Sequence, residues 1–265
     1  MVTKTPRATN RRQRVQSAET GMGILKALAA LGGSASLTAI AQAVNESTAK
    51  VHRYLLSLVQ EEMVVQHAAT QHYQLGPAAV RIGLAALRQC DPIRLGESAL
   101  VRLREQLEVT CFIAVMGNKG PTVLRIEEPS LPVTVNIRAG SVLPMLWSAA
   151  GQVFLAFADD TRGREQAGEE YANAPGEQRA LLAGPDPVER LCRQVREQGC
   201  AIVHDMLLAG ISAIAAPIFD ASGKVVAVLT ALGASTGFDT RPGGRICPEL
   251  MREAATISEA MGWSP

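Results

Sequence analysis

Residues 47–60, STAKVHRYLLSLVQ, are the stretch that decides the fold of the N-terminal part of the chain. Its apolar residues recur at helical spacing and predict one buried stripe, made of Val51, Leu55, Leu58 and Val59. Ser47 or Thr48 can cap this helix. The opposite face carries cations and hydroxyl groups, from Lys50, Arg53, Tyr54 and Ser57. Such a face suits the major groove of DNA, although it is also typical of an ordinary solvated helix.

Two further helices are predicted before this stretch. The first begins near Glu19 and ends at Gly32-Gly33, with an apolar face of Ile24, Leu25, Leu28 and Leu31. The second is short and contains Leu37, Ile40, Ala41 and Val44. Only the polar pair Asn45-Glu46 separates it from the helix at 47–60. A helix, a tight turn and a second helix predict a helix-turn-helix.

A β-hairpin is predicted directly after the third helix. Residues 63–65 are apolar, residues 72–75 alternate polar and apolar side chains, and the turn His67 to Gln71 lies between them. A hairpin in this place is the wing of a winged helix, with His72 on it. We therefore expect a winged helix-turn-helix DNA-binding domain over residues 17–76.

The charge is distributed unevenly along the 265 residues. Residues 1–90 carry ten Lys/Arg against four Asp/Glu, while residues 91–265 carry sixteen against twenty-one. The imbalance favours a nucleic-acid-binding module joined to a part that does not bind nucleic acid. Residues 1–16 form a basic arm, whose Arg11, Arg12 and Arg14 suit phosphate or minor-groove contacts. A solvated tail is the equal alternative for this arm.

The string Val51 to Leu58, the hairpin end Tyr73 to Gly76 and the opening Val15 to Glu19 resemble the IclR family of bacterial transcription regulators. The chain departs from the family at Ala49-Lys50, where Ser-Thr is usual. The resemblance implies that a helix at 77–91 links two domains and contributes to a dimer, with dimers pairing into tetramers. The DNA contacts that we predict on a pseudo-palindromic operator come from nine residues: Arg11, Arg12, Arg14, Ser47, Thr48, Lys50, Arg53, Tyr54 and His72.

Residues 92–265 are expected to form one α+β domain with an antiparallel sheet, because short turns join successive β-rich runs. The predicted helices are 93–107, 148–158, 186–198 and 245–262. The predicted strands are 111–116, 122–126, 133–137, 200–206, 211–219 and 224–232.

The resemblance continues in this second part, at Ser148 to Phe157, Gly210 to Pro217 and Gly223 to Ala227. It implies a GAF-like sensor domain with a small-molecule cavity. Better-understood members often have an acidic residue, a Cys or Ser, and a Ser where this chain has Val203, Ala213 and Leu232. The effector-binding residues that we expect are Val135, Met145, Trp147, Ser148, Ala149, Ala150, Val203, Ile211, Ala213, Thr230 and Leu232.

The apolar substitutions in this pocket favour an effector with a sizeable apolar or aromatic body. A very small, polar acid would leave hydrogen bonds unmade there, at about 1–3 kcal/mol each. Its carboxylate would lie at the start of the helix that Ser148 caps, although small residues that simply pack there are the plainer alternative.

Catalytic chemistry is not indicated. Cys200, His204 and Asp205 suggest a triad, but along a strand Cys200 and His204 would lie about 13 Å apart, beyond hydrogen-bonding reach. The four histidines and five cysteines show no metal-ligand spacing, so we expect no metal or cofactor and mostly buried, reduced thiols. The charge pairs Asp159-Asp160 and Glu169-Glu170 are expected to be solvated surface.

Three functional classes compete. A ligand-responsive transcription regulator fits best. A small-molecule enzyme with a helical N-terminal dimerisation domain would need a convergent acid, base or nucleophile, and an architectural DNA-binding protein would leave the large second domain without a role. No apolar run approaches the roughly 18 residues of a membrane span, and no secretory signal precedes Ile24, so we expect a cytoplasmic protein.

Overall fold

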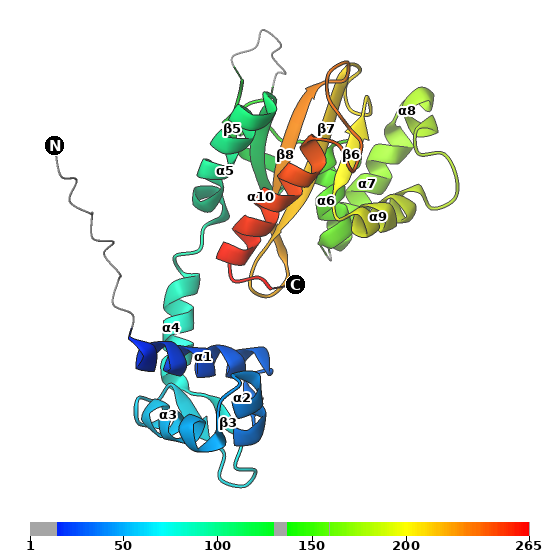
Figure 1. Ribbon diagram of the computed structural model, residues 1–265. Coiled ribbons are helices and arrows are strands. Elements are labelled where there is room, and N and C mark those ends of the chain that lie inside the picture. The colour runs from blue at the N-terminus through cyan, green and yellow to red at the C-terminus, as the bar shows by residue number, and fades with distance from the viewer. Residues whose placement is uncertain (1–14, 130–136, 159, 265) are drawn as a thin grey trace, which may run out of the picture. The chain divides into compact units, whose positions relative to one another are not determined.

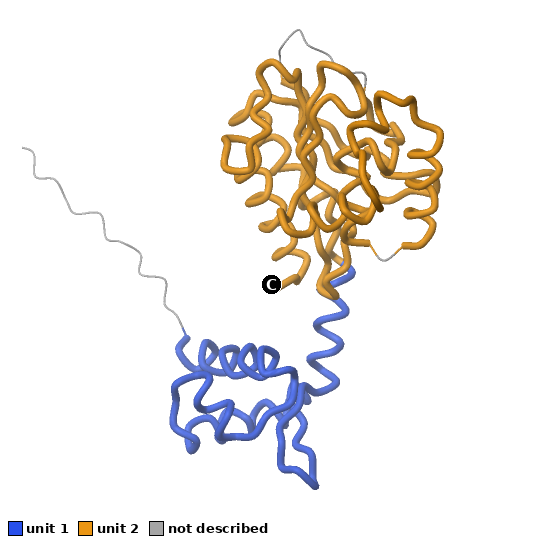
Figure 2. Tube along the Cα trace, turned by 90° about the vertical axis from the view of Figure 1, so that its right-hand side faces the viewer, with its two compact units in different colours: residues 1–88 blue, residues 89–265 orange. Residues whose placement is uncertain are grey.

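The computed structural model describes residues 15–129, 137–158 and 160–264 of the chain. It divides into two compact units, Met1–Arg88 and Gln89–Pro265, coloured separately in Figure 2. The division falls inside the segment predicted as a linker helix, residues 77–91. Within the described residues, no helix is both long and apolar enough to cross a bilayer.

The first unit consists of helices and a small three-stranded sheet (Figure 1). Its helices are α1 (Gln16–Ala30), α2 (Leu37–Ala43), α3 (Thr48–Gln60) and α4 (Pro77–Leu87), and its strands are β1 (Ser34–Ala35), β2 (Val64–Gln66) and β3 (Tyr73–Leu75). The sheet is antiparallel in the order β1-β3-β2, so the hairpin of β2 and β3 gains the two-residue β1 as a third strand. The predicted helix-turn-helix with a wing is confirmed.

Local sequence signals account for the ends of α2 and α3. Ser36 Oγ accepts a hydrogen bond from Ala39 N at 3.2 Å, and Ser47 Oγ accepts one from Lys50 N at 3.3 Å, as helix caps do. The apolar stripes of the three helices and the wing then meet in one core, made of Ile24, Leu28, Ala35, Ile40, Ala41, Val51, Leu55, Val64 and Tyr73. Val59, expected in this core, is instead 38% exposed.

The second unit is built on a five-stranded antiparallel sheet in the order β5-β4-β8-β7-β6. Its strands are β4 (Thr110–Gly117), β5 (Gly120–Glu127), β6 (Ala201–His204), β7 (Ile211–Phe219) and β8 (Val225–Ala234). Its helices are α5 (Pro92–Leu107), α6 (Ala149–Phe157), α7 (Thr161–Asn173), α8 (Gly176–Ala180), α9 (Pro187–Gln198) and α10 (Ile246–Ala260). The predicted α+β domain with an antiparallel sheet is confirmed.

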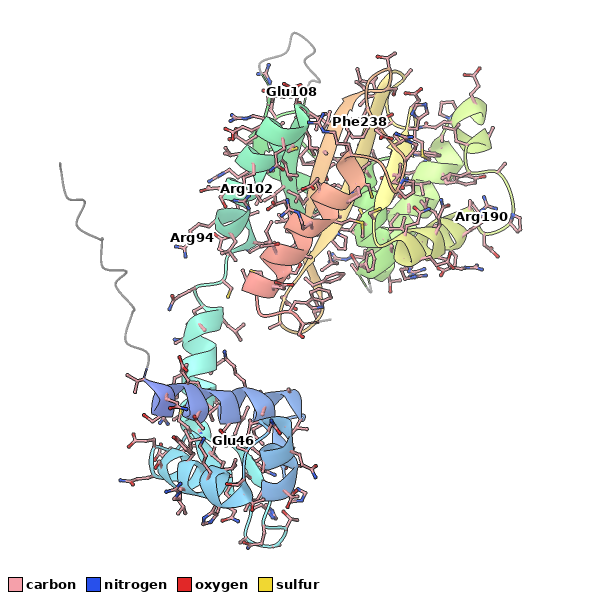
Figure 3. The ribbon with its side chains drawn as sticks, in the orientation of Figure 1. Glu46, Arg94, Arg102, Glu108, Arg190 and Phe238 are labelled. Carbon is pink, nitrogen blue, oxygen red and sulfur yellow. The ribbon has the colours of Figure 1, made fainter. Side chains whose placement is uncertain are left out.

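Helices cover both faces of this sheet (Figure 1). Leu229 and Ala231 of β8 pack with α5 and α10, whereas Val228 and Leu232 pack with α6 and α9, because successive side chains on a strand point to opposite faces. On the first face, Arg102 of α5, labelled in Figure 3, pairs with the buried Glu253 of α10 at 2.6 Å. The second face contains the cavity described below.

Several predicted features of the second unit were wrong. Helices α7 and α8 were not predicted, because α7 buries only Gly163 and Ala167 and shows no apolar period. Strand β6 is shorter than expected, and the predicted strand 133–137 lies, except for its last residue, outside the described residues.

Two of the four acidic residues expected at the solvated surface, Asp160 and Glu170, are half-buried, whereas Glu169 is exposed as expected. The Asp160 carboxylate caps α7 by accepting from Arg162 N at 3.1 Å, and Asp159 lies outside the described residues. The two carboxylate oxygens of Glu170 accept from Met145 N and Leu146 N, each at 2.9 Å. Glu170 therefore braces the turn that leads into α6 rather than facing solvent alone.

Candidate DNA-binding surface and ligand cavity

The exposed face of α3 is centred on Arg53. Arg53 is exposed together with its helical neighbours His52, Leu56 and Ser57, while Val51 and Leu55 are buried beneath them. Ser47 and Thr48 are exposed at the N-terminal end of the helix. A guanidinium with hydroxyl groups one to two turns away is the chemistry that contacts base edges and phosphates.

Two of the predicted DNA contacts on α3 lie at its flank. Lys50 is half-buried and its Nζ pairs with Glu46 Oε1 at 2.5 Å; Glu46 is labelled in Figure 3. Tyr54 is also half-buried and packs against the core of the unit. A phosphate would have to compete with Glu46 for Lys50, so this residue is less available than Arg53.

The remaining predicted DNA contacts lie outside α3. His72 is exposed on the wing, beside the start of β3. Arg11, Arg12 and Arg14 of the arm lie outside the described residues. His52 and Leu56 are exposed beside Arg53 on the outer face of α3, but they were not among the nine predicted contacts. Their spacing of one and three residues from Arg53 along the helix could have indicated their place on this face.

A cavity of about 320 Å³ lies in the second unit, between α6, the sheet and the loop from β6 to β7. Nine predicted effector-binding residues line it: Trp147, Ser148, Ala149, Ala150, Val203, Ile211, Ala213, Thr230 and Leu232. Five further lining residues were not predicted: Phe112, Ile137, Leu143, Leu207 and Leu208. Phe112 lies opposite Thr230 across β4 and β8, a pairing that the sequence analysis did not predict.

Met145 does not line the cavity, contrary to the prediction. Its side chain is buried against α7 instead. Its Cε lies only 3.1 Å from the point that a Cβ on Gly163 would occupy. Val135 lies outside the described residues.

The N-terminal residues of α6 line the cavity. Ser148 Oγ accepts from Gly151 N at 3.0 Å and donates to Pro144 O at 2.6 Å, so its hydroxyl is already engaged. The first N–H groups of a helix have no acceptor within the helix. The N–H groups of Ala149 and Ala150, which line the cavity, are therefore available to a ligand at this end of α6. This end of a helix favours a carboxylate by about 0.3–1 kcal/mol or more.

A second layer holds this helix end in place. Glu170 anchors Met145 and Leu146, and Gln152 Nε2 donates to Leu146 O at 3.0 Å. Trp147 stacks on Tyr171 of α7, with ring centroids 6.5 Å apart. The turn before α6 is therefore tied to α6 and α7, and its backbone is preorganised.

Thr230 supplies an uncommitted polar group to the cavity wall. Its side chain is 1% exposed, and its Oγ1 is the single buried side-chain oxygen or nitrogen without a hydrogen-bond partner among the described residues. An unsatisfied buried hydroxyl costs about 1–3 kcal/mol. Such a group in a cavity wall indicates a place for a polar atom of a ligand.

The structure gives Cys200 and His204, the nucleophile and base considered from the sequence, different partners. Cys200 Sγ lies 3.3 Å from Cys247 Sγ, whereas His204 Nδ1 bonds to Ser212 Oγ at 2.8 Å. Burial raises the pKa of the Cys111 thiol to about 12, which leaves it protonated and unreactive at neutral pH. In the described part of the chain, no three His, Cys, Asp or Glu side chains are grouped as metal ligands.

Comparisons with known proteins agree with this arrangement. Residues 17–68 match the IclR helix-turn-helix domain, and residues 84–259 match the C-terminal domain of bacterial transcriptional regulators of the IclR type. The Pca regulon regulatory protein of Pseudomonas putida is 27% identical over 212 residues, covering 79% of this chain and 71% of that protein. KdgR of Escherichia coli is 24% identical, covering 91% of this chain and 90% of that protein.

A solved structure extends the likeness to three dimensions. HmgR of Pseudomonas aeruginosa superposes with a TM-score of 0.83 and 40% sequence identity, covering 94% of this chain and 99% of that one. The match therefore spans both units and their sequences. The chain belongs to the IclR family of bacterial transcriptional regulators, and it is a DNA-binding regulator rather than an enzyme.

Proposed function

We propose that this regulator binds a pseudo-palindromic operator as a dimer and that a small organic acid in the cavity changes its affinity for DNA. Arg53 and the start of α3 contact base edges, and the wing with His72 and the basic arm contact phosphates. The effector acts by favouring one of the arrangements of the protein that differ in their fit to the operator.

The lining of the cavity supports an acid with an apolar or aromatic body. Twelve of the fourteen lining residues are aliphatic or aromatic, and Ser148 has its hydroxyl engaged within the protein. The Ala149 and Ala150 amides suit a carboxylate, and Thr230 suits one further polar atom. The observation that carries the proposal is this combination of an apolar cavity with a helix end and an unpaired hydroxyl in its wall.

Calorimetry on the full-length protein tests the effector class. We expect 3-phenylpropionate or benzoate to bind more tightly than glyoxylate, because glyoxylate would leave most of its hydrogen bonds unmade in an apolar cavity. The same acids should shift the midpoint of a salt-titrated binding curve for DNA from beside the gene. That binding should be sequence-selective and weaken steeply with salt.

Thr230→Val is the control for the polar contact in this experiment. It keeps the shape of the side chain but removes the hydroxyl, so it should stabilise the free protein by about 1 kcal/mol while leaving DNA binding intact. Tighter binding of glyoxylate than of either aromatic acid would contradict the proposed effector class, and equal binding to unrelated DNA would contradict the proposed operator recognition.

Helix α4 supports the dimer. No residue of α4 is buried, and its large apolar side chains are about half exposed or more: Val80 56%, Ile82 60%, Leu84 51% and Leu87 48%. Val80, Leu84 and Leu87 follow one another at helical spacing on one face of α4, and an exposed apolar face of this kind marks a protein–protein contact. We infer that a second copy of the chain covers α4, as the family resemblance also implies, and that dimers can pair further.

Leu84→Glu should dissociate this dimer, because a carboxylate would have to be buried in the apolar contact. Sedimentation velocity should show a single chain for the variant and a multiple of it for the wild type. Leu181→Glu is the matched control, since Leu181 is 54% exposed, close to the 51% of Leu84, but lies outside α4. A Leu84→Glu protein that sediments like the wild type would place the contact elsewhere.

A further inference from the structure

The loop between β6 and β7 forms the outer wall of the cavity. It spans residues 205–210, and its Leu207 and Leu208 line the cavity although they are 44% and 58% exposed. The other twelve lining residues are buried or half-buried. These two leucines therefore form the solvent-exposed part of the cavity wall.

The Asp205 carboxylate holds the base of this loop together, beside the backbone hydrogen bonds from Asp205 N to Ile211 O and from Ser235 N to Gly210 O. Asp205 Oδ1 accepts from Gly210 N at 3.0 Å, which joins the two ends of the loop, and from Ser235 Oγ at 2.5 Å, which ties the loop to the end of β8. Asp205 and Gly210 have φ of +54° and +80°. A left-handed conformation is unfavourable for a non-glycine residue, so the Asp205 backbone depends on these contacts.

The carboxylate also orders a chain of hydroxyl groups behind the loop. Ser235 Oγ lies 2.9 Å from Ser212 Oγ, which lies 2.8 Å from His204 Nδ1, and His204 Nε2 lies 3.5 Å from Asp205 Oδ2. These four residues, Asp205, Ser235, Ser212 and His204, close a ring that we call the latch. Ser212 is fully buried, so the ring links a buried strand to the exposed loop.

Ionised Asp205 determines the direction of every hydrogen bond in the latch. A carboxylate only accepts, so Ser235 donates to it and must accept from Ser212, because each hydroxyl has one proton. Ser212 in turn accepts from His204 Nδ1–H. The hydrogen bond from the Ser235 hydroxyl, followed by the nearby His204 imidazole and the backbone N–H groups of Gly210 and Ile211, holds the pKa of Asp205 below its usual value.

We propose that Asp205 is a positioning residue of the ligand cavity, whose carboxylate latches residues 206–210 as a movable wall through which ligands enter and leave. The inference rests on the proposed function only in taking this cavity as the effector site. A latch of this kind controls how fast the cavity opens. Loosening it raises the rates of ligand entry and exit together, whereas a residue that contacts ligand acts mostly on the rate of exit.

Asp205→Asn in the full-length chain tests the latch. The asparagine side chain can still accept a hydrogen bond from Gly210, but it offers Ser235 a neutral acceptor in place of a charged one. The loop should therefore open more often, and hydrogen exchange of the backbone N–H groups across residues 206–211 should quicken at least about ten-fold. Stopped-flow fluorescence with the aromatic anion 1-anilinonaphthalene-8-sulfonate should show both rate constants rising by similar factors. To restrict the signal to probe in the cavity, energy transfer from Trp147 is followed in a Trp263→Phe background.

Asp220→Asn is the matched control. Asp220 makes the same kind of contacts in the turn at the other end of β7, where its Oδ1 accepts from Ser222 N at 2.8 Å and Lys224 N at 3.1 Å. Its variant should leave exchange at 206–211 and both probe rates unchanged. Wild-type exchange in Asp205→Asn, or a change in the exit rate alone, would overturn the latch. If the latch results hold but no acid alters DNA affinity, the effector proposal fails and the latch stands.

Discussion

Arg53→Ala is expected to weaken specific DNA binding by about 5- to 150-fold, equivalent to 1–3 kcal/mol for a guanidinium paired with a base edge. We expect a loss of affinity of this size because Arg53 is exposed at the centre of the outer face of α3. Lys50, the other predicted cation on α3, is less available to DNA because it is paired with Glu46. Fluorescence anisotropy with DNA from beside the gene, over a range of salt concentrations, measures the effect.

Arg53→Lys separates charge from geometry in this experiment. Lysine preserves the phosphate attraction but not the planar fork that pairs with guanine. If Arg53 contacts a base, the lysine variant should lose sequence selectivity while its salt dependence stays close to that of the wild type. If lysine restores full affinity and selectivity, Arg53 contacts phosphate only. Wild-type affinity in Arg53→Ala would remove α3 as the recognition helix.

Gly151→Ala should lower the free energy of unfolding of the second unit by about 3 kcal/mol, at the upper end for overpacking. A Cβ on Gly151 would lie 2.2 Å from Met145 O and 2.4 Å from Pro144 O. Both contacts are backbone atoms, and Glu170 and Ser148 hold this turn in place. The turn before α6 therefore has to move, which shifts the Ala149 and Ala150 amides away from the position that suits a carboxylate. We expect the variant to lose binding of aromatic acids as well as stability.

Gly168→Ala is the matched control, and its expected effect has the opposite sign. Gly168 is exposed in α7, with nothing within 4 Å of its Cβ position. Alanine there should stabilise the protein by about 0.5–1 kcal/mol, as expected for a helix interior. Thermal or urea unfolding measures both variants. Equal stability of the two would mean that the turn before α6 yields easily and does not define the cavity.

Local patterns predicted the elements whose own sequence contains the signal. The apolar period and Ser47 place α3, the alternation around residues 67–71 places the wing, and the turn at Asp220 to Gly223 places β7 and β8. Helix α7 was missed for the same reason. It packs with the small residues Gly163 and Ala167, so its sequence shows no apolar stripe to detect.

The candidate cavity was only partly predictable. Nine of its lining residues followed from the family resemblance. Leu207 and Leu208 did not, because an exposed pair of leucines in a loop has no periodicity. Met145 was predicted to line the cavity, but its side chain packs against α7 instead.

The sequence alone determined the winged helix and the α+β class, because these depend on hydrophobic period, caps and turns within short segments. It indicated the family through the resemblance of its motifs. Only the tertiary structure decided which polar side chains have hydrogen-bond partners within the protein. Glu170 engages backbone groups 24 and 25 residues away, and Asp205 engages Ser235 across 30 residues. Thr230 is left unpaired. Such pairings depend on which strands and helices become neighbours, and local sequence spacing does not encode that.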